Sequence, residues 1–425
     1  METINISPGV RLTVINELKF KTACLSMNVL TPLRKETAAM CAVLPYVLRR
    51  GTASKPDMQA IEAYLDDNYG ARLEAFVRKR GETQICGFYS DFADEAFVGS
   101  DTMLLEKMAE LMGEMLLSPA TFGGRLRPEY VETERENLLA DIRASLNDKR
   151  GYANLSLIQN MFKKEAYGVP KLGRELEAKK ISVATLTRYY RELIAASPIE
   201  VIYVGAASAR RVESAVKSAL STKMPVFGAS MPQTEVFDGS IKKPKIIREE
   251  LPLKQAKLSI GYRIGKSAIE NNQPALTIMN SIFGGAVTSK LFREVREKRG
   301  LCYYASSTVD RMKGAMFVSC GIDTEKYDEA MDAIASQLSA MQEGDITDEE
   351  LENAKSFVVG AMYSVEDSLP ARESVTLNFL LQGLDIKPSE FGGLCDLVTK
   401  EEVVRCAQSV QLDTVFFLAG KGSAK

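Results

Sequence analysis

The sequence predicts an α+β protein of two homologous domains, each a mostly antiparallel sheet covered by helices. Apolar residues recur with period two in some segments and with helical spacing in others. The order of these segments in the first half of the chain is repeated in the second half. A chain of 425 residues is also longer than one hydrophobic core usually serves. These three observations together favour a duplicated domain.

In the first half, two strands precede two helices, a hairpin follows, and further helices lead to a short buried strand. The hairpin turns at Gly81-Glu82, a pair of the kind found in tight turns. The second helix opens at Pro56, and proline is favoured at a helix start. We expect strands over 10–15, 23–29, 72–80, 83–90 and 201–205, and helices over 32–50, 56–68, 93–117, 128–147, 150–165 and 183–195.

The second half follows the same order. Its third segment is a helix that stops at Gly300, a residue favoured just past a helix end. We expect strands over 257–262, 303–309, 315–321 and 415–419, and helices over 273–282, 288–298, 327–341, 348–364, 370–381 and 400–410.

Two local matches support the duplication. Asp-Glu-Ala-Phe at 94–97 opens a long helix after a strand, and Asp-Glu-Ala-Met at 328–331 does the same in the second half. On the next helix, the segment 134–139 of the first half matches 351–355 of the second. One short match means little, but two matches within a repeated order of elements indicate two copies of one domain.

A polar segment with few apolar residues joins the two halves, which is typical of a linker. We therefore assign residues 1–225 to a first domain, 226–245 to the linker and 246–425 to a second domain.

Composition narrows the possible functions. The formal net charge is −2, so the chain has no global attraction for nucleic acid or an anionic membrane. No segment reaches the length of a membrane-spanning helix, and the N-terminus lacks the pattern of a signal peptide. The seven cysteines include no Cys-x-x-Cys pair, which fits buried thiols in a reducing compartment. We expect a cytoplasmic protein with no nucleic-acid or membrane partner.

The chain contains no histidine. This excludes the Ser–His and Cys–His arrangements of nucleophilic catalysis and every zinc site that uses imidazole. The cysteines are not spaced to replace histidine as ligands. We expect no cofactor in this chain, although a magnesium site made only of carboxylates stays open.

The sequence SKLFREVREKRGLCY at 289–303 resembles the C-terminal-domain motif of the insulinase-like M16 metallopeptidases. The preceding segment Asn-Ser-Ile-Phe-Gly-Gly at 280–285 also fits this motif. The resemblance covers essentially the whole chain. It implies the two-domain M16 fold, in which one chain forms half of a clamshell, and it places the chain among the members of bacterial-type two-chain pairs.

Active members of this family carry His-x-x-Glu-His on a helix of the first domain, followed closely by Gly-Thr. The two histidines share one helix face and bind Zn²⁺, and the glutamate deprotonates the metal-bound water. Counting back from Gly51-Thr52, the resemblance places these positions on Ala42, Pro45 and Tyr46.

A later glutamate completes the zinc site in the active family, and its position here falls on Asp141. The four matching residues therefore form a degenerate metal site. Proline cannot act as a base, and we expect the helix either to kink at Pro45 or to begin there.

A second family feature is retained. In active members an Arg and a Tyr seven residues apart reach from the C-terminal domain to the substrate backbone, and the matching pair here is Arg296 and Tyr303. Arg supplies a fork of donors for a carbonyl, and Tyr supplies an O–H. The alternative is that Arg296 lies on a solvated helix face and that Tyr303 fills the core.

Three functions are compatible with these features. The first is a non-catalytic, substrate-binding subunit of a two-chain peptidase, in which a zinc-bearing M16 chain is the partner and a peptide is the substrate. The second is a scaffold subunit of a larger complex, which would need neither zinc nor the Arg–Tyr pair. The third is unrelated chemistry on the same fold, for which no residue cluster stands out.

Overall fold

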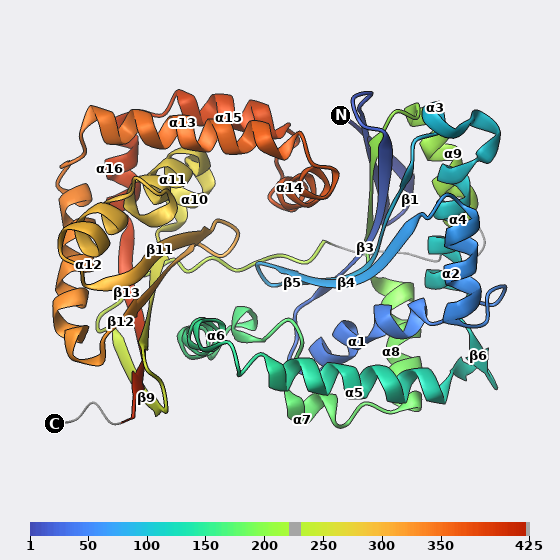
Figure 1. Cartoon of the computed structure of the whole chain (residues 1–425), viewed down its shortest axis with the longest axis horizontal. Helices are drawn as coiled ribbons and strands as arrows, with labels where there is room; N and C mark the ends of the chain where they lie inside the picture. Colours follow the sequence, from blue (N-terminus) through green and yellow to red (C-terminus); the bar gives the residue numbers. More distant parts are fainter. Residues whose placement is uncertain (221–230, 422–425) are drawn as a thin grey trace. The chain divides into compact units, whose positions relative to one another are not determined.

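The computed structural model describes residues 1–220 and 231–421, and this part of the chain divides into two compact units, each with its own sheet (Figure 1). Neither unit is a continuous stretch of sequence. The first contains Met1–Arg143, Val169–Gln233 and Asp367–Ile386, and the second contains Ala144–Gly168, Thr234–Glu366 and Lys387–Lys425. Each unit therefore includes one segment from the half of the chain that mainly builds the other.

The first unit is built on a six-stranded sheet in the order β1-β2-β8-β3-β5-β4. Neighbouring strands are antiparallel, except that β2 and β8 are parallel. Strand β4 forms one edge and pairs only with β5 among the described strands. The strands are β1 (Glu2–Ser7), β2 (Val10–Asn16), β3 (Thr22–Pro32), β4 (Arg72–Arg80), β5 (Thr83–Ala93) and β8 (Ile199–Gly205).

Helices of the first unit enclose its larger core on one face of the sheet. Sheet residues such as Leu25 and Phe88 pack there with helical residues such as Leu44 and Met108. The helices are α1 (Ala38–Arg49), α2 (Met58–Asp67), α3 (Glu95–Val98), α4 (Leu104–Leu117), α5 (Pro128–Ala144), α7 (Glu175–Ala178), α8 (Val183–Ala196) and α9 (Ala209–Leu220), with a small hairpin of β6 (Thr121–Phe122) and β7 (Arg125–Leu126).

Helix α14 (Leu369–Leu381) covers the opposite face of this sheet. Its Leu377 and Leu380 belong to a second apolar cluster with Ile202 of β8. Ile202 follows Val201, which belongs to the larger core, and successive strand residues point to opposite faces. The sheet is thus buried on both sides, and one side is covered by a helix from the distant end of the sequence.

The second unit is built on a five-stranded sheet in the order β11-β12-β10-β13-β9, antiparallel except for the parallel pair β13 and β9. The strands are β9 (Lys245–Leu251), β10 (Ala256–Ile264), β11 (Cys302–Asp310), β12 (Ala315–Ile322) and β13 (Val410–Gly420). The helices are α10 (Lys266–Asn271), α11 (Gln273–Asn280), α12 (Tyr327–Gln342), α13 (Asp348–Val365), α15 (Pro388–Asp396) and α16 (Lys400–Gln408), with π-helical segments at Ser281–Gly285 and Leu291–Lys298.

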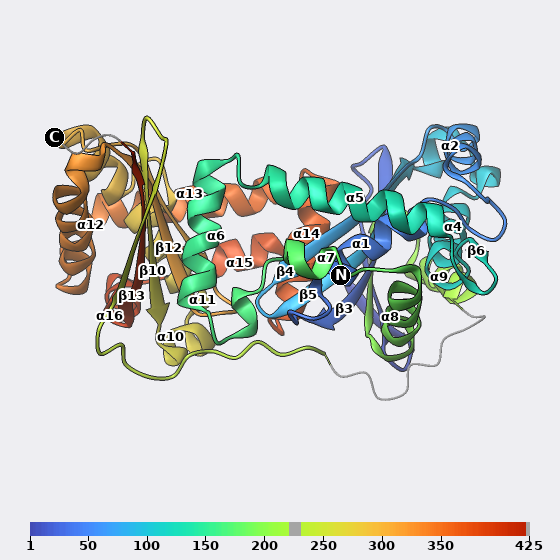
Figure 2. The same cartoon turned by 90° about the horizontal axis from the view of Figure 1, so that it is seen from below.

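Helix α6 (Lys149–Met161), from the first half of the chain, lies against this second sheet (Figure 2). Its Leu157 packs with Phe416 and Leu418 of β13. Just after the helix, Arg263 of β10 binds Glu165 and Asp413, and the buried Lys313 Nζ lies 2.7 Å from Glu165. Apolar packing and a charged network therefore both fix this helix to the sheet.

The two sheets are equivalent in order. In each, a central strand (β3 or β10) lies between a hairpin (β4–β5 or β11–β12) and the strand β8 or β13. Helix α14 contacts β3 and β8, and α6 contacts the equivalent β10 and β13. The predicted α+β class and the repeated order of elements are confirmed. The predicted domain boundaries follow the chain, whereas the compact units exchange these two helices.

Some element boundaries differ from the sequence prediction. The helix predicted over 93–117 is divided into α3, a short 3₁₀ turn and α4, because Gly99 (φ 108°) and Met103 (φ 51°) have left-handed backbone conformations that interrupt a right-handed helix. The helix predicted over 32–50 begins at Ala38, since β3 extends to Pro32.

The predicted linker is only partly described. Its first residues, 226–230, lie outside the described residues, and 231–244 contain no helix or strand. No helix within 1–220 and 231–421 is long and apolar enough to cross a membrane.

Candidate functional site

Helix α1 carries three of the four degenerate metal positions. Ala42 is buried, with 1% of its surface exposed, and Pro45 lies inside the helix. The helix begins seven residues before Pro45, so the prediction that it could start at the proline is wrong. Because proline has no N–H, this turn lacks one helical hydrogen bond. Burial of α1 against the sheet keeps the helix formed across this gap.

Of the three positions on α1, Tyr46 is the exposed one, with 40% of its surface exposed. Burial raises the pKa of the Tyr46 phenol, and the nearby charge of Asp141 raises it further. Glu134 and Glu74 act in the same direction. The phenol therefore stays protonated at neutral pH and is a poor ligand for zinc.

The structure thus brings Asp141, on α5, near Tyr46, on α1. Glu134, about two turns earlier on α5, is held by Arg50 at 2.5 Å. Within the described residues no group of three or more Cys, Asp or Glu side chains is arranged to hold a metal ion. The four positions therefore offer one carboxylate, one protonated phenol and two side chains without donor atoms, and their chemistry does not fit zinc.

Arg296 and Tyr303 lie in the second unit. Arg296 is on the π-helical segment Leu291–Lys298, and its guanidinium carbon is 4.7 Å from the centre of the Phe292 ring. Tyr303 lies where the register of β11 shifts between Cys302 and Tyr304. This bulge turns the Tyr303 side chain outward, and 66% of its surface is exposed. The alternative that Tyr303 fills the core is wrong.

A thiol lies between these two positions in the sequence. A hydrogen bond with Cys320 lowers the pKa of the Cys302 thiol, and the charge of Arg296 lowers it further. The guanidinium of Arg296 therefore lies near the start of β11. Whether Arg296 and Tyr303 act together on a substrate stays a prediction.

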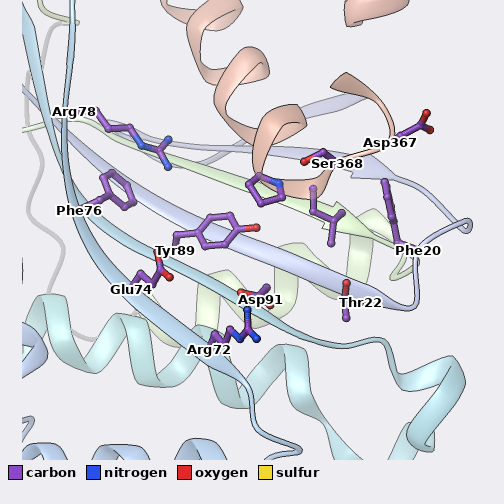
Figure 3. A pocket seen from close by; sticks show the side chains of 12 residues that line it. Phe20, Thr22, Arg72, Glu74, Phe76, Arg78, Tyr89, Asp91, Asp367 and Ser368 are labelled. Carbon is purple, nitrogen blue, oxygen red and sulfur yellow. The ribbon is translucent and has the colours of Figure 1, made fainter. Parts of the chain in front are cut away.

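A cavity of about 510 Å³ lies on the sheet of the first unit (Figure 3). It is bounded by the edge hairpin β4–β5, the start of β3 and the N-terminal end of α14. Its lining consists of Phe20, Thr22, Arg72, Glu74, Phe76, Arg78, Tyr89, Asp91, Asp367, Ser368, Leu369 and Pro370. Local sequence patterns do not predict this cavity, because α14, which forms one wall, comes from a segment far from β4 in the sequence.

Two of the charges around this cavity are neutralised by close partners. Arg78 donates to both carboxylate oxygens of Glu373, at 3.0 and 2.8 Å. Asp367 accepts from Lys19 at 2.9 Å. Ion pairs therefore occupy the side of the cavity toward Arg78 and the outer rim at Asp367.

The remaining charges, Arg72, Glu74 and Asp91, gather at the other end (Figure 3). Burial raises the pKa of the Asp91 carboxyl, the charge of Arg72 lowers it, and the charge of Glu74 raises it. Arg72 and Asp91 are register partners across β4 and β5. Two carboxylates and one arginine thus lie at this end of the cavity.

Comparison with known proteins places this chain in a family. It is 32% identical over 416 residues to "Probable inactive metalloprotease YmfF" of Bacillus subtilis, covering 98% of this chain and 97% of that protein. This chain belongs to the M16 peptidase family. The family model described as "Peptidase M16 inactive domain" matches residues 180–358.

One further relative is named as a zinc protease, and one solved structure shares the fold. "Uncharacterized zinc protease YmxG" of Bacillus subtilis is 24% identical over 391 residues, covering 88% of this chain and 87% of that protein. A conserved protein from Enterococcus faecalis V583, solved by crystallography, superposes with a TM-score of 0.90 at 26% identity, covering 100% of this chain and 99% of that one. This M16 chain thus has the family's two-domain α+β fold.

Proposed function

We propose that this chain is the non-catalytic, substrate-binding subunit of a two-chain zinc peptidase. The zinc, and the His-x-x-Glu-His helix that holds it, belong to a partner chain of the same family. This chain contributes part of the peptide-binding surface and needs no cofactor of its own.

The observation that carries the proposal is the position of strand β4. It is an edge strand, so one side of its backbone is available to pair with an added peptide strand. It also runs beside α1, since Arg49 Nε donates to the Leu73 carbonyl at 2.9 Å. A peptide added to β4 would therefore lie beside Ala42 and Tyr46, where an active relative would hold its metal.

The retained pair in the second unit supports the same role. Tyr303 presents an exposed hydroxyl, and Arg296 is on the segment packed against β11. These are donors suited to a peptide carbonyl. A scaffold would have no use for them.

The relatives support a pair of unlike chains. Bacillus subtilis has both a relative named as inactive and one named as a zinc protease. A chain that has lost its metal ligands while keeping its fold and its edge strand fits the first role, and the second chain of such a pair supplies zinc.

Reconstitution tests the proposal. The chain and the His-x-x-Glu-His member from the same genome are purified separately and assayed, alone and mixed, on a library of fluorogenic peptides. We expect hydrolysis only from the mixture, and its loss when the partner's motif glutamate is changed to glutamine. Hydrolysis by the partner alone at the same rate, or none from the mixture, would favour the scaffold function.

A further inference from the structure

The cavity on the first unit has a counterpart in the second unit. In the first, Glu74 of β4 faces Tyr89 of β5, and in the second, Tyr304 of β11 faces Gly321 of β12. Glu74 lies six residues before the end of the edge strand β4, and Tyr304 lies six residues before the end of the edge strand β11. Each unit therefore places one aromatic ring at the same register position, although the ring comes from different strands.

In the second unit this ring is covered by an arginine. Arg150, in the first turn of α6, has its guanidinium carbon 4.2 Å from the centre of the Tyr304 ring. Its Nη2 also donates to Ser306 at 3.1 Å. A guanidinium stacked on an aromatic face is a stabilising arrangement. The second unit thus fills this place with its own cation.

In the first unit the equivalent helix places no cation on the ring, because Arg372 of α14 is paired with Glu17 at 2.7 Å. The first turn of α14 contains Leu369 and Pro370, which line the cavity instead of filling it. The Tyr89 ring lies among the lining side chains, between Phe76 and Phe20 in the view of Figure 3. The cavity therefore occupies the place that Arg150 takes in the second unit.

The polar groups around Tyr89 suit a cation. Glu74 and Asp91 carry two negative charges against the single charge of Arg72, which leaves an excess of one carboxylate. The Tyr89 side chain is only 8% exposed, and among the described residues its hydroxyl has no partner other than the weakly bonding Cys24 thiol. An unpartnered buried oxygen can accept a hydrogen bond from a ligand.

We propose that this cavity binds the guanidinium of an arginine side chain in a peptide added to β4. This inference rests on the proposed function, because it needs a peptide on that edge. Alternate side chains of an added strand point to the face that α14 covers. The guanidinium lies on the Tyr89 ring, as Arg150 lies on Tyr304, and donates to Glu74, Asp91 and the Tyr89 oxygen.

Two peptides that differ in one charge test the inference. One is an extended nine-residue peptide of Ser, Thr and Val with a central arginine, and the other has citrulline, which has nearly the same shape but no charge, in its place. Binding to the isolated chain is measured by fluorescence anisotropy. We expect the arginine peptide to bind about tenfold more tightly, which corresponds to the cost of losing one charged contact.

Variants locate the site. The double variant Glu74→Gln with Asp91→Asn keeps the shape of both side chains, and we expect it to bring the two affinities within about twofold of each other. The control is Glu132→Gln on α5, an exposed side chain that does not line the cavity, which should keep the tenfold ratio. Circular dichroism checks that all variants are folded. An unchanged ratio in the double variant would overturn the inference.

One further measurement distinguishes a failure of this inference from a failure of the proposed function. The ratio of kcat/KM for the two peptides is also measured on the reconstituted pair. Hydrolysis with equal rates for arginine and citrulline would reject the cavity and keep the peptidase subunit. Discrimination by the isolated chain without any hydrolysis by the pair would keep the cavity and reject the subunit. Equally tight binding of acetylarginine amide alone would overturn the requirement for a peptide on β4.

Discussion

Arg78 of β4 and Glu373 of α14 form a two-point ion pair between segments 295 positions apart in the sequence. The Glu373 carboxylate has no solvent exposure, whereas Arg78 is partly exposed. The pair fixes the N-terminal half of α14 over the edge hairpin. It therefore shapes the cavity and also ties the last third of the chain to the first unit.

We expect Glu373→Ala to lower the free energy of unfolding by about 3 kcal/mol, because breaking a buried ion pair leaves an uncompensated charge. Urea denaturation measures this change in the free energy of unfolding. The matched control is Lys19→Ala, which breaks the exposed pair with Asp367 and should cost about 0–1 kcal/mol. Equal midpoints for Glu373→Ala and the wild type would show that α14 is not held by this contact.

A charged contact in the second unit, between Glu165 and the pair Arg263 and Lys313, predicts a pH dependence. Burial raises the pKa of the Glu165 carboxyl, but hydrogen bonds from Arg263 and Lys313 outweigh this and hold it below its ordinary value of 4.5. A lowered pKa in the folded state stabilises the fold above the unfolded pKa, and this stabilisation is lost as the pH falls.

We therefore expect the wild type to lose stability as the pH falls below about 4.5. Glu165→Gln should be less stable at pH 7 and should show a shallower loss between about pH 5 and pH 3. Urea denaturation at several pH values measures both. Glu192→Gln on α8 removes an exposed carboxylate and is the control. The same slope for Glu165→Gln and the wild type would show that Glu165 is not the titrating group.

Metal content tests the degenerate motif. We expect the purified chain to hold no stoichiometric zinc, since Ala42, Pro45 and Tyr46 offer no ligand set. Changing these three to His, Glu and His should still give no peptidase activity while Asp141 remains one carbon short of glutamate. Zinc analysis and a peptide assay measure both. Full activity of the triple variant would show that Asp141 is not the third-ligand position.

Arg296 tests the role of the second unit. In the reconstituted pair, Arg296→Ala should lower kcat by about 100-fold if its donors stabilise the developing oxyanion. Assembly should be unchanged, as measured by size-exclusion chromatography. Arg293→Ala is the control, because Arg293 is exposed on the same segment and lies 3.8 Å from Glu350. Equal turnover of Arg296→Ala and the wild type would leave Arg296 a structural role alone.

The sequence predicted the features that depend on local spacing. The order of elements, the duplication and the placement of Ala42 and Tyr46 on one helix all follow from short-range patterns. The exchange of α6 and α14 could not be predicted. The apolar pattern of a helix shows that one of its faces is buried, but it does not show which of the two sheets that face packs against. The outward position of Tyr303 depends on a bulge, and the break before α4 depends on two left-handed residues. None of these leaves a periodic signal.

The measurement to make first is a native pull-down of the tagged chain from its own cell, with the co-purifying proteins identified and quantified. The account predicts one partner of similar size, in equal amount, that carries His-x-x-Glu-His and binds zinc. Recovery of the chain alone, or with a large assembly in which no member has that motif, would contradict the two-chain peptidase and favour the scaffold.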